Sequence, residues 1–447
     1  MPNYTVEKHH IRKGHSEWSA CDSLCFKSKN LYNQALYRVR QHYFKTGKYL
    51  GYSKIQKELQ DEKAECYALL KSKVAQLTLK QVDHDFNSFF GALKSWKKDP
   101  SKFLGKPRIP YYKETNGRNS VSFNAQSMSK TTFKKGILQL SGLLLSLPLQ
   151  HSIELLSKTK KGKTYKTPSI KEATITPDGD GFVVIIKHEI PEVKLIKENG
   201  LLAGMDLGVN NLSAVSTNVK DATNFMVNGR PLKSINQYYN KELAVLRSKY
   251  DMCKTRSGKK KLQDRIRKLC RKRNHKVEDY LHKASRMLVN RLVSLGVTHL
   301  IVGKNDGWKQ ETDMSKRSNQ NFVQIPHARF IQMLQYKWGA LGLKFSLPEE
   351  SYTSKCSFID GESLEHHDKY KGRRIKRGLF KSADGFLINA DINGSGNTVR
   401  KVVENAWDLW SHEDLIEGFV VSPENLTVPQ PRKETETGSV EIVFSTI

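Results

Sequence analysis

The chain has 447 residues, which is too many for one ordinary domain, so we expect two or three domains. Its 75 Lys and Arg residues against 45 Asp and Glu residues give a formal net charge of +30, which indicates a polyanionic partner. Because no run of about 18 apolar residues is present to span a bilayer, nucleic acid is favoured over a membrane as that partner.

The N-terminal half predicts a short strand, then helices, then further strands. Residues 1–15 are expected to contain the first strand, with a basic end. From 16 to 96 the apolar residues recur at three- and four-residue spacing, which predicts helices. The basic segment 100–110 contains Pro and Gly and is typical of a linker. Short strands are expected over 119–195, the clearest at 182–186.

From residue 201 onward, expected strands alternate with helices, which favours an α/β domain. The expected elements are a strand region at 201–217, a long helical stretch at 233–294, a strand at 298–302, a helix at 325–341 and a strand at 343–347. Beyond about residue 411 the sequence is less basic and has no clear period, so a flexible tail is expected.

Two Asp residues stand out from their surroundings. Asp206 interrupts an apolar strand-like segment, where a carboxylate needs a metal cation or, alternatively, backbone N–H groups at a strand end. Asp391 lies where small and polar residues begin a helix-like run. Two such acids on an α/β core in a basic protein suggest two-metal phosphodiester chemistry.

A third carboxylate is expected near these two acids. Mg²⁺ prefers oxygen ligands and keeps several waters, so two or three carboxylates are sufficient. The candidates are Glu349 and Glu350, which follow the strand expected at 343–347. Adjacent strand residues point to opposite faces, so only one of them can face the metals, and periodicity does not decide which. An ordinary polar strand end is the alternative interpretation.

Two segments concentrate positive charge. In 254–276, Asp264 is the only acidic residue, and this one-sided run favours phosphate contacts. In 369–381, Tyr370 and Phe380 alternate with cations, which suits stacking on unpaired bases; a surface hairpin with two core aromatics is the alternative. The predicted nucleic-acid contacts in the two segments are Lys260, Arg267, Arg271, Arg273, Arg373, Arg374 and Arg377.

The cysteine pattern indicates a cytoplasmic protein without zinc. The six Cys residues show no repeated pair spacing, and no signal-peptide pattern is visible, so free thiols in a reducing compartment are expected. Cys21 and Cys25 are one helical turn apart without a second pair. Cys356 with His366 and His367 is better explained as a loop with incidental histidines than as a zinc site.

Several motifs occur together in one order and resemble the TnpB family of transposon-encoded proteins, relatives of the type V CRISPR effector nucleases. They are GMDLGVNNL (204–212), YLHKASRMLV (280–289), IVGKNDGWKQ (301–310), NQNFVQIPHARFIQMLQYK (319–337), EESYTSKCSF (349–358), GRRIKRGLF (372–380) and NADINGSGN (389–397). The resemblance spans about 200–403. It extends more weakly to 71–90, which looks like the recognition helices of that family.

The resemblance implies a multidomain α+β fold with a ribonuclease-H-like (RuvC) α/β nuclease domain. It also implies an N-terminal β-barrel-like wedge domain and an inserted helical recognition domain. The expected boundaries are 1–15 and 101–198 for the wedge, 16–100 for the recognition domain, 199–354 and 388–410 for the nuclease domain with a basic helical insertion at 233–294, 355–387 for a target-nucleic-acid-binding insertion, and 411–447 for a flexible tail.

The function implied by the resemblance is that of an RNA-guided DNA endonuclease of a transposon. Its cofactors would be Mg²⁺ or Mn²⁺ and a noncoding guide RNA. Its substrate would be double-stranded DNA, cut beside a short target-adjacent motif. The expected location is the prokaryotic cytoplasm, at the nucleoid when the protein is bound to its target. Asp206 and Asp391 match the first and third carboxylates of the family.

Two departures from the family pattern affect this interpretation. Most members carry the second carboxylate in a strand ending in a Val-Glu-Asp-Leu-like motif, but here that strand ends with Ile-Val-Gly-Lys at 301–304. A subgroup carries the acid on the neighbouring strand, and on this ground we choose Glu350. The Cys-x-x-Cys pairs of the insertion are also missing, because only Cys356 remains, so no zinc is expected.

Two other functions and one further contact remain open. Loss of the usual Glu suggests a nuclease-inactive, RNA-guided DNA-binding repressor as the main alternative, and a strand-joining transposase is a third possibility. Lys73 and Gln76 share one helix face, where Gln can read adenine edges and Lys can contact guanine or phosphate of the target-adjacent motif. An ordinary exposed polar face is the alternative.

Overall fold

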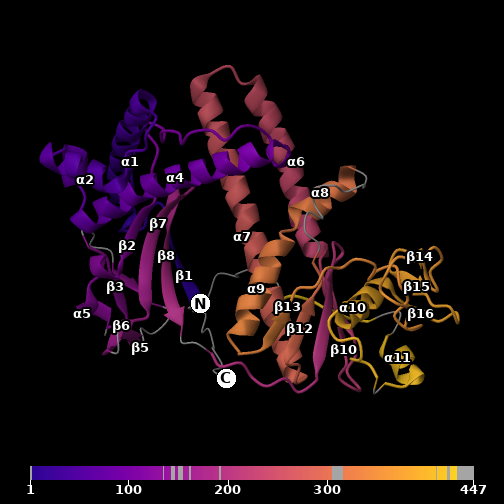
Figure 1. The fold of residues 1–447 in the computed structure, drawn as a ribbon. Coiled ribbons are helices and arrows are strands. Elements are labelled where there is room, and N and C mark those ends of the chain that lie inside the picture. Colours follow the sequence, from indigo (N-terminus) through magenta and orange to yellow (C-terminus); the bar gives the residue numbers. More distant parts are fainter. Residues whose placement is uncertain are drawn as a thin grey trace, which may run out of the picture. The chain divides into compact units, whose positions relative to one another are not determined.

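The computed structural model describes residues 3–133, 135–141, 146–149, 155–160, 163–190, 193–304, 316–408, 410–419 and 423–429. The chain forms two compact units, Met1–Glu192 and Val193–Ile447 (Figure 1). Within the described residues, no helix combines the length and the apolar character needed to cross a membrane.

The helices of the first unit pack on each other through regularly spaced apolar residues. They are α1 (Trp18–Thr46), α2 (Tyr52–Asp61), α3 (Glu65–Ala68) and α4 (Ser72–Lys98). Leu31, Leu36 and Val39 of α1 are buried in the same core as Leu79 and Phe86 of α4. The helical pattern expected between 16 and 96 is therefore present.

The strands of the first unit form a four-stranded antiparallel sheet and two separate pairs. The sheet has the order β1 (Asn3–Ile11), β8 (Gly181–Ile190), β7 (Ile170–Asp178) and β2 (Val121–Asn124). The pairs are β3 (Ile137–Gln139) with β4 (Ser146–Pro148) and β5 (Leu155–Lys160) with β6 (Lys163–Pro168); a short helix, α5 (Lys130–Phe133), precedes β3. The barrel-like wedge stays a prediction.

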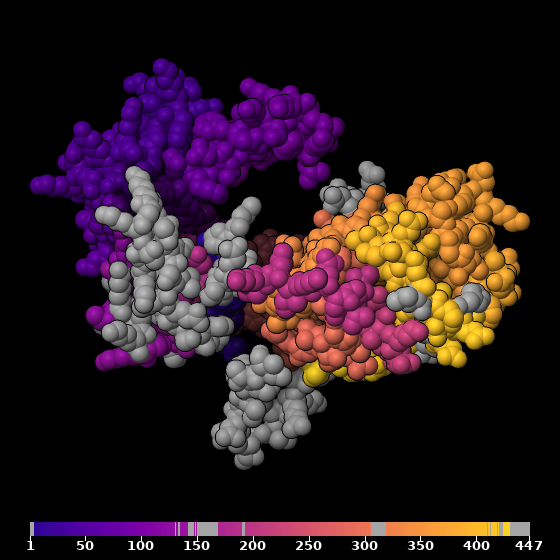
Figure 2. Space-filling model, turned by 60° about the horizontal axis from the view of Figure 1, so that its bottom comes forward, coloured from indigo at the N-terminus to yellow at the C-terminus, as the bar shows by residue number. Residues whose placement is uncertain are grey.

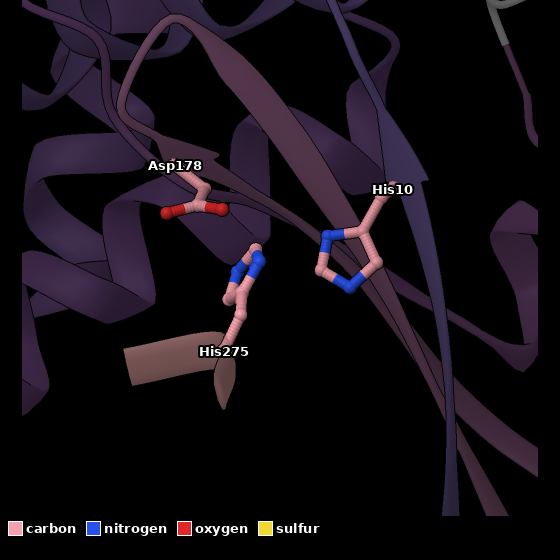
Figure 3. A group of neighbouring side chains, drawn as sticks. All are labelled: His10, Asp178 and His275. Carbon is pink, nitrogen blue, oxygen red and sulfur yellow. The ribbon is translucent and has the colours of Figure 1, made fainter. Parts of the chain in front are cut away.

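Figure 3 labels His10 of β1 and Asp178, the last residue of β7, which lie on strands of the same sheet in the first unit. Each pairs with β8: His10 lies opposite Val183 and Asp178 opposite Gly181. The third labelled residue, His275, belongs to the second unit. The three residues therefore define no site within either unit.

The second unit is built on a six-stranded mixed sheet. The order across the sheet is β13 (Lys344–Ser346), β12 (His299–Val302), β9 (Leu202–Leu207), β10 (Asn211–Thr217), β11 (Phe225–Asn228) and β17 (Glu424–Leu426). β10 runs antiparallel to both of its neighbours, β9 and β11, whereas β9, β12 and β13 are mutually parallel.

Different helices cover the two faces of this sheet (Figure 1). α7 (Arg256–Ser294) and α9 (His327–Gly339) cover one face with large apolar side chains, among them Leu288 and Phe330. α10 (Ala390–Arg400) lies on the other face. Because alternate strand residues face opposite sides of a sheet, Met205 packs into the apolar core under α7 and α9, while Asp206 faces α10.

The basic helical stretch forms a long antiparallel pair. α6 (Arg230–Met252) and α7 are joined by a turn at 253–255, and α8 (Lys316–Gln324) packs against α6 (Figure 1). Thr255 caps α7 by accepting a hydrogen bond from the Gly258 N–H at 3.1 Å. The segment 254–276 therefore lies mostly on the N-terminal half of α7.

The insertion between β13 and α10 contains a small antiparallel sheet. It is formed by β14 (Arg373–Lys376), β15 (Leu379–Lys381) and β16 (Leu387–Asn389), and β16 leads directly into α10. Phe380 is buried in the core of this region, so it does not offer a stacking surface for bases. Phe380 therefore agrees with the alternative interpretation of this segment, a hairpin with core aromatics, and not with base stacking.

The expectation of a flexible tail from residue 411 is wrong for its first part. α11 (His412–Gly418) begins with a capping box at Ser411, and Phe419 packs on Phe358 and Trp407. β17 then pairs with β11 as the sixth strand of the sheet. Residues 430–447 of the expected tail lie outside the described residues.

Candidate metal centre

Asp206 lies near the carboxyl end of β9, on the face that α10 covers. Its backbone pairs with Ala214 of β10. On the other side, the Gly303 N–H donates to the Met205 carbonyl at 3.1 Å, so the end of β12 lies beside the same point of β9. Asp206 therefore occupies a central strand end where neighbouring elements converge.

Helix α10 brings Asp391 close to Asp206. Asn389 caps the helix, since its Oδ1 accepts from the N–H groups of Asp391 at 3.0 Å and Ile392 at 3.3 Å. A Cβ added at Gly394 would lie 3.0 Å from Asp206 Oδ2, and one added at Gly204 would overlap the Ser395 carbonyl oxygen. Glycine at both positions thus allows helix and strand to approach closely.

Glu350 reaches the same region from the segment after β13. Glu349 is exposed, whereas Glu350 is half-buried. A Cβ added at Gly303 would lie 2.7 Å from the carboxyl carbon of Glu350, so this side chain lies directly over the end of β12. The Thr353 hydroxyl donates to the Glu350 carbonyl at 2.8 Å and fixes the local backbone. Gly303 stands where the family motif usually has its acid, and it leaves the space that Glu350 fills.

The three acids interact electrostatically. Burial raises the pKa of Asp206 well above its usual value, and the charges of Glu350 and Asp391 raise it further, while Arg374 lowers it. Burial also raises the pKa of Glu350 to about 7. Their oxygens do not all lie within 4.8 Å of one another, as far as the described residues show. Carboxylates that repel one another in this way resist simultaneous ionisation unless a cation is added.

Asp391 accepts hydrogen bonds from two residues on different elements. Asn211, the first residue of β10, donates from Nδ2 to Oδ2 at 2.9 Å. Arg374 of β14 donates from Nη2 to Oδ1 at 3.1 Å. Asn211 was not a sequence-predicted site residue, and its only signal is its place in the 204–212 motif. Arg374 was predicted to contact nucleic acid, but here it pairs with a carboxylate.

The predicted contacts on α7 do not all have the same environment. Lys260 and Arg267 are exposed, Arg267 with an ion pair to Asp264 at 3.4 Å, and Arg271 is half-exposed. Arg273 differs, because its guanidinium bridges helices. It donates to Asn236 Oδ1 at 2.8 Å and to the Gln324 carbonyl at 2.9 Å, and it lies over the Tyr239 ring.

Arg273 therefore has a structural role within the second unit. Its side chain joins α6 and α7 to the end of α8, and burial lowers its pKa. These bonds distinguish Arg273 from Lys260 and Arg267 of the same segment, and its predicted contact with nucleic acid stays a prediction.

The other predicted contacts are exposed on their own units. Arg373 and Arg377 are exposed in the insertion, where residues from about 350 to 419 gather on one side of the second unit (orange to yellow in Figure 2). In the first unit, Lys73 is exposed and Gln76 half-exposed near the start of α4. Gln76 Nε2 donates to Ser72 Oγ of the preceding turn at 3.5 Å.

Two family models match the chain in consecutive segments. Residues 185–309 match OrfB_IS605, described as a probable transposase, and residues 327–398 match the Cas12f1-like TNB domain. The chain is a TnpB-like protein. This finding confirms the resemblance recognised from the motifs between 204 and 397. A comparison with curated protein sequences found no match.

Solved structures are similar to this TnpB-like chain over most of its length. A Cas12f1–sgRNA–target DNA complex is 14% identical, with 90% of this chain and 100% of that chain covered and a TM-score of 0.34. The mini-RNA-guided endonuclease CRISPR-Cas_phi3 is 10% identical, with 89% and 92% covered and a TM-score of 0.45. A binary complex of AacC2c1 with sgRNA is also 10% identical, with 87% and 71% covered and a TM-score of 0.30.

In the TnpB-like chain, a buried carboxylate connects the loops of the insertion. Glu362 accepts hydrogen bonds from the backbone N–H groups of Ser357 and Lys371, both at 2.7 Å. Asn393 and Asn397 of α10 donate to the Cys356 carbonyl, each at 2.9 Å. These bonds hold the segments on both sides of β14 without any ligand set of the Cys-x-x-Cys type.

The donor set at the centre fits a hard divalent cation. All three side chains are carboxylates, the ligands that Mg²⁺ and Mn²⁺ prefer, and they come from strand, loop and helix. The raised pKa values of Asp206 and Glu350 give a further reason, since a bound cation would stabilise their charged forms.

Proposed function

We propose that this TnpB-like protein is an RNA-guided, metal-dependent DNA endonuclease with a ribonuclease-H-like (RuvC-type) domain. The observation that carries the proposal is the convergence of Asp206, Glu350 and Asp391 at one end of a mixed sheet. The strand order supports it, with one antiparallel strand, β10, between the central β9 and β11. Such a core is what the TnpB resemblance implies.

In this proposal, Asp206, Glu350 and Asp391 hold two Mg²⁺ or Mn²⁺ ions. When bound, such ions lower the pKa of a water and stabilise the leaving 3′-oxygen of a phosphodiester. The chain's own contribution is orientation. Gly303 leaves room for Glu350, and Asn211 and Arg374 hold Asp391. The product would be a hydrolysed strand of double-stranded DNA beside a target-adjacent motif.

The exposed cations are proposed to hold the guide RNA and the DNA. The net charge of +30 favours polyanionic partners, and phosphate contacts would account for the exposed Lys260 and Arg267 and the half-exposed Arg271 on α7. Arg373 and Arg377 would contact the target strand from the insertion. Lys73 and Gln76 on α4 are proposed to read the target-adjacent motif, in a recognition domain at 16–100 within the first unit.

A binding-only repressor is the less favoured function. It was suggested by the missing acid at the end of β12, but Glu350 lies over Gly303 at that point and restores a third carboxylate to the region. A repressor would bind target DNA with its guide and leave the DNA intact. A strand-joining transposase would instead give joined products on a transposon-end substrate.

The test is cleavage of plasmids by the protein purified with its own RNA. Sequencing of the copurified RNA identifies the guide, and a plasmid library with a matching target then reveals the adjacent motif. We expect linear plasmid with Mg²⁺, intact plasmid with EDTA, and intact plasmid with Asp206→Ala, whose RNA and DNA binding should stay near wild type. Asp251→Ala, an exposed acid on α6, is the matched control. Metal-independent cutting, or cutting by Asp206→Ala, would refute the site.

A further inference from the structure

The two residues that donate hydrogen bonds to Asp391 differ in charge and in how firmly the surrounding structure holds them. Asn211 brings a neutral amide to Oδ2, and Arg374 brings a guanidinium to Oδ1. A neutral donor orients a carboxylate while leaving its charge intact. A cation near the same oxygens neutralises that charge and opposes a second cation. The two contacts should therefore affect metal binding in opposite directions.

Asn211 is held in place by the turn between β9 and β10. His327, buried at the start of α9, donates from Nε2 to the Gly208 carbonyl at 2.9 Å. The Gly229 N–H donates to the Asn210 carbonyl at 2.7 Å on the other side. A Cβ at Gly208 would lie only 2.6 Å from the Asn211 carbonyl oxygen, so the turn is closely packed. The Asn211 amide is thus preorganised toward Asp391.

Arg374 is held less firmly. It lies on β14, the outer strand of the insertion sheet, where all four residues are exposed, and its side chain is 48% exposed. An ion pair this exposed contributes little to stability, because water and salt screen it. The guanidinium can therefore leave Asp391 at small energetic cost, whereas the Asn211 amide stays in place.

We propose that Asn211 is a positioning residue that presents Asp391 to the divalent ions, whereas Arg374 competes with those ions for the same carboxylate. This inference rests on the proposed function of the site. Asn211 fixes Oδ2 and so directs Oδ1 toward the side shared with Arg374. A cation bound at Asp391 then displaces Arg374 but keeps the Asn211 hydrogen bond.

The test measures Mn²⁺ binding to the full-length protein with its RNA, by electron paramagnetic resonance. Binding by the Asp206→Ala complex is subtracted, because the RNA itself binds Mn²⁺. Removing an outer-shell partner typically costs about 10- to 100-fold in metal affinity, so we expect that loss in Asn211→Ala. Asn210→Ala, the adjacent half-buried residue, is the matched control and should bind as wild type. Arg374→Gln should bind roughly two- to fivefold more tightly.

A second variant separates positioning from folding. Asn211→Leu keeps the branched shape and the number of side-chain heavy atoms without a donor, and it should show the same loss of Mn²⁺ affinity at an unchanged melting temperature. For both Asn211 variants, the Mg²⁺ concentration at half-maximal cleavage should rise, while the rate at saturating Mg²⁺ recovers. A merely structural role would instead lower the melting temperature and leave the affinity of the folded fraction unchanged, which would overturn the proposal.

The remaining outcomes distinguish the inference from the proposed function. If wild type binds Mn²⁺ above the Asp206→Ala background but Asn211→Ala binds equally well, the positioning role is wrong and the metal centre stands. If Arg374→Gln weakens binding as Asn211→Ala does, the opposed roles are wrong. If wild type does not exceed the background at all, the metal centre itself is refuted, and the inference fails with it.

Discussion

The two faces of the six-stranded sheet differ in their residues and in their roles. The face under α7 and α9 is filled by large apolar side chains such as Leu281, Leu288, Leu292, Phe330, Leu334 and Trp338. The other face has apolar side chains as well, such as Ile301 and Phe358, but where α10 meets β9 and β10 it is packed by small and polar residues, among them Gly204, Ser216, Asn393, Gly394 and Ser395. Burial of large side chains stabilises the first face. Close backbone approach positions acids on the second.

Hydrogen bonds take the place of large side chains where α10 contacts β9 and β10. The Ser216 and Ser395 hydroxyls bond to each other, and Ser216 also donates to the Ile392 carbonyl at 3.3 Å. Short side chains let α10 lie directly on β9, so Asp391 reaches Asp206. The stability of the second unit and the geometry of its acidic site therefore depend on different faces of the sheet. Mutations on each face test whether the two properties are separable.

The largest effect on stability is expected on the apolar face. Leu288→Ala removes a fully buried side chain from the α7 core, which typically costs about 2–5 kcal/mol of unfolding free energy. Urea unfolding measures this loss. At low temperature, where the variant remains folded, its Mn²⁺ affinity should equal that of wild type. A parallel loss of metal affinity would show that the two faces are not separable.

A mutation on the α10 face should cost less stability than Leu288→Ala but should also disturb the metal centre. The methyl group of Gly204→Ala overlaps the Ser395 carbonyl and must move α10, at a typical cost of about 1–3 kcal/mol. Unlike Leu288→Ala, this variant should also lose Mn²⁺ affinity and cleavage. Gly91→Ala in α4 is the control, because an added Cβ there meets nothing within 4 Å. Wild-type cleavage by Gly204→Ala would contradict the account.

The acids themselves make stability depend on pH in the absence of metal. The pKa of Glu350 is raised to about 7 from a usual 4.5, so the folded state binds this proton more tightly than the unfolded state. The resulting stabilisation is complete below about pH 4.5 and is lost as pH rises through about 7. Unfolding in EDTA over this interval should show a falling free energy in wild type and a flatter curve in Glu350→Gln. Equal slopes would contradict the assignment.

The smallest effects are expected on the α6–α7 pair, away from either face. Lys260→Ala should reduce the slope of log affinity against log salt by about one for RNA binding, as the loss of one phosphate contact does. Arg273→Ala should leave that slope unchanged and lower the unfolding free energy instead, because its guanidinium bridges helices. Filter binding at several salt concentrations separates the two. A reduced slope for Arg273→Ala would restore it as a phosphate contact.

Local sequence predicted the acids of the site better than their surroundings. Asp206 and Asp391 stood out because each interrupts a pattern of apolar or small residues. The choice of Glu350 over Glu349 came from the family resemblance and not from strand alternation, which no longer applies at these residues because β13 ends at Ser346. Asn211 was missed because an uncharged residue after a turn resembles any other turn residue.

Long-range packing accounts for the other differences between sequence and structure. In a run of cations, nothing local distinguishes Arg273 from Arg271; only α6 and α8 bury its guanidinium. β17 has no sequence period of its own and exists because it pairs with β11. Phe380 is buried by residues on α10 and beyond. Each of these outcomes depends on partners far away in the chain.

The most direct test of the central claim compares the two adjacent glutamates at the centre. Plasmid cleavage with the copurified guide RNA and Mg²⁺ is measured for Glu350→Gln and for its exposed neighbour, Glu349→Gln. Glu350 lies over Gly303 beside Asp206, and Glu349 is exposed to solvent. The account predicts loss of cleavage in Glu350→Gln with retained DNA binding, and wild-type cleavage in Glu349→Gln. Full activity of Glu350→Gln would contradict it.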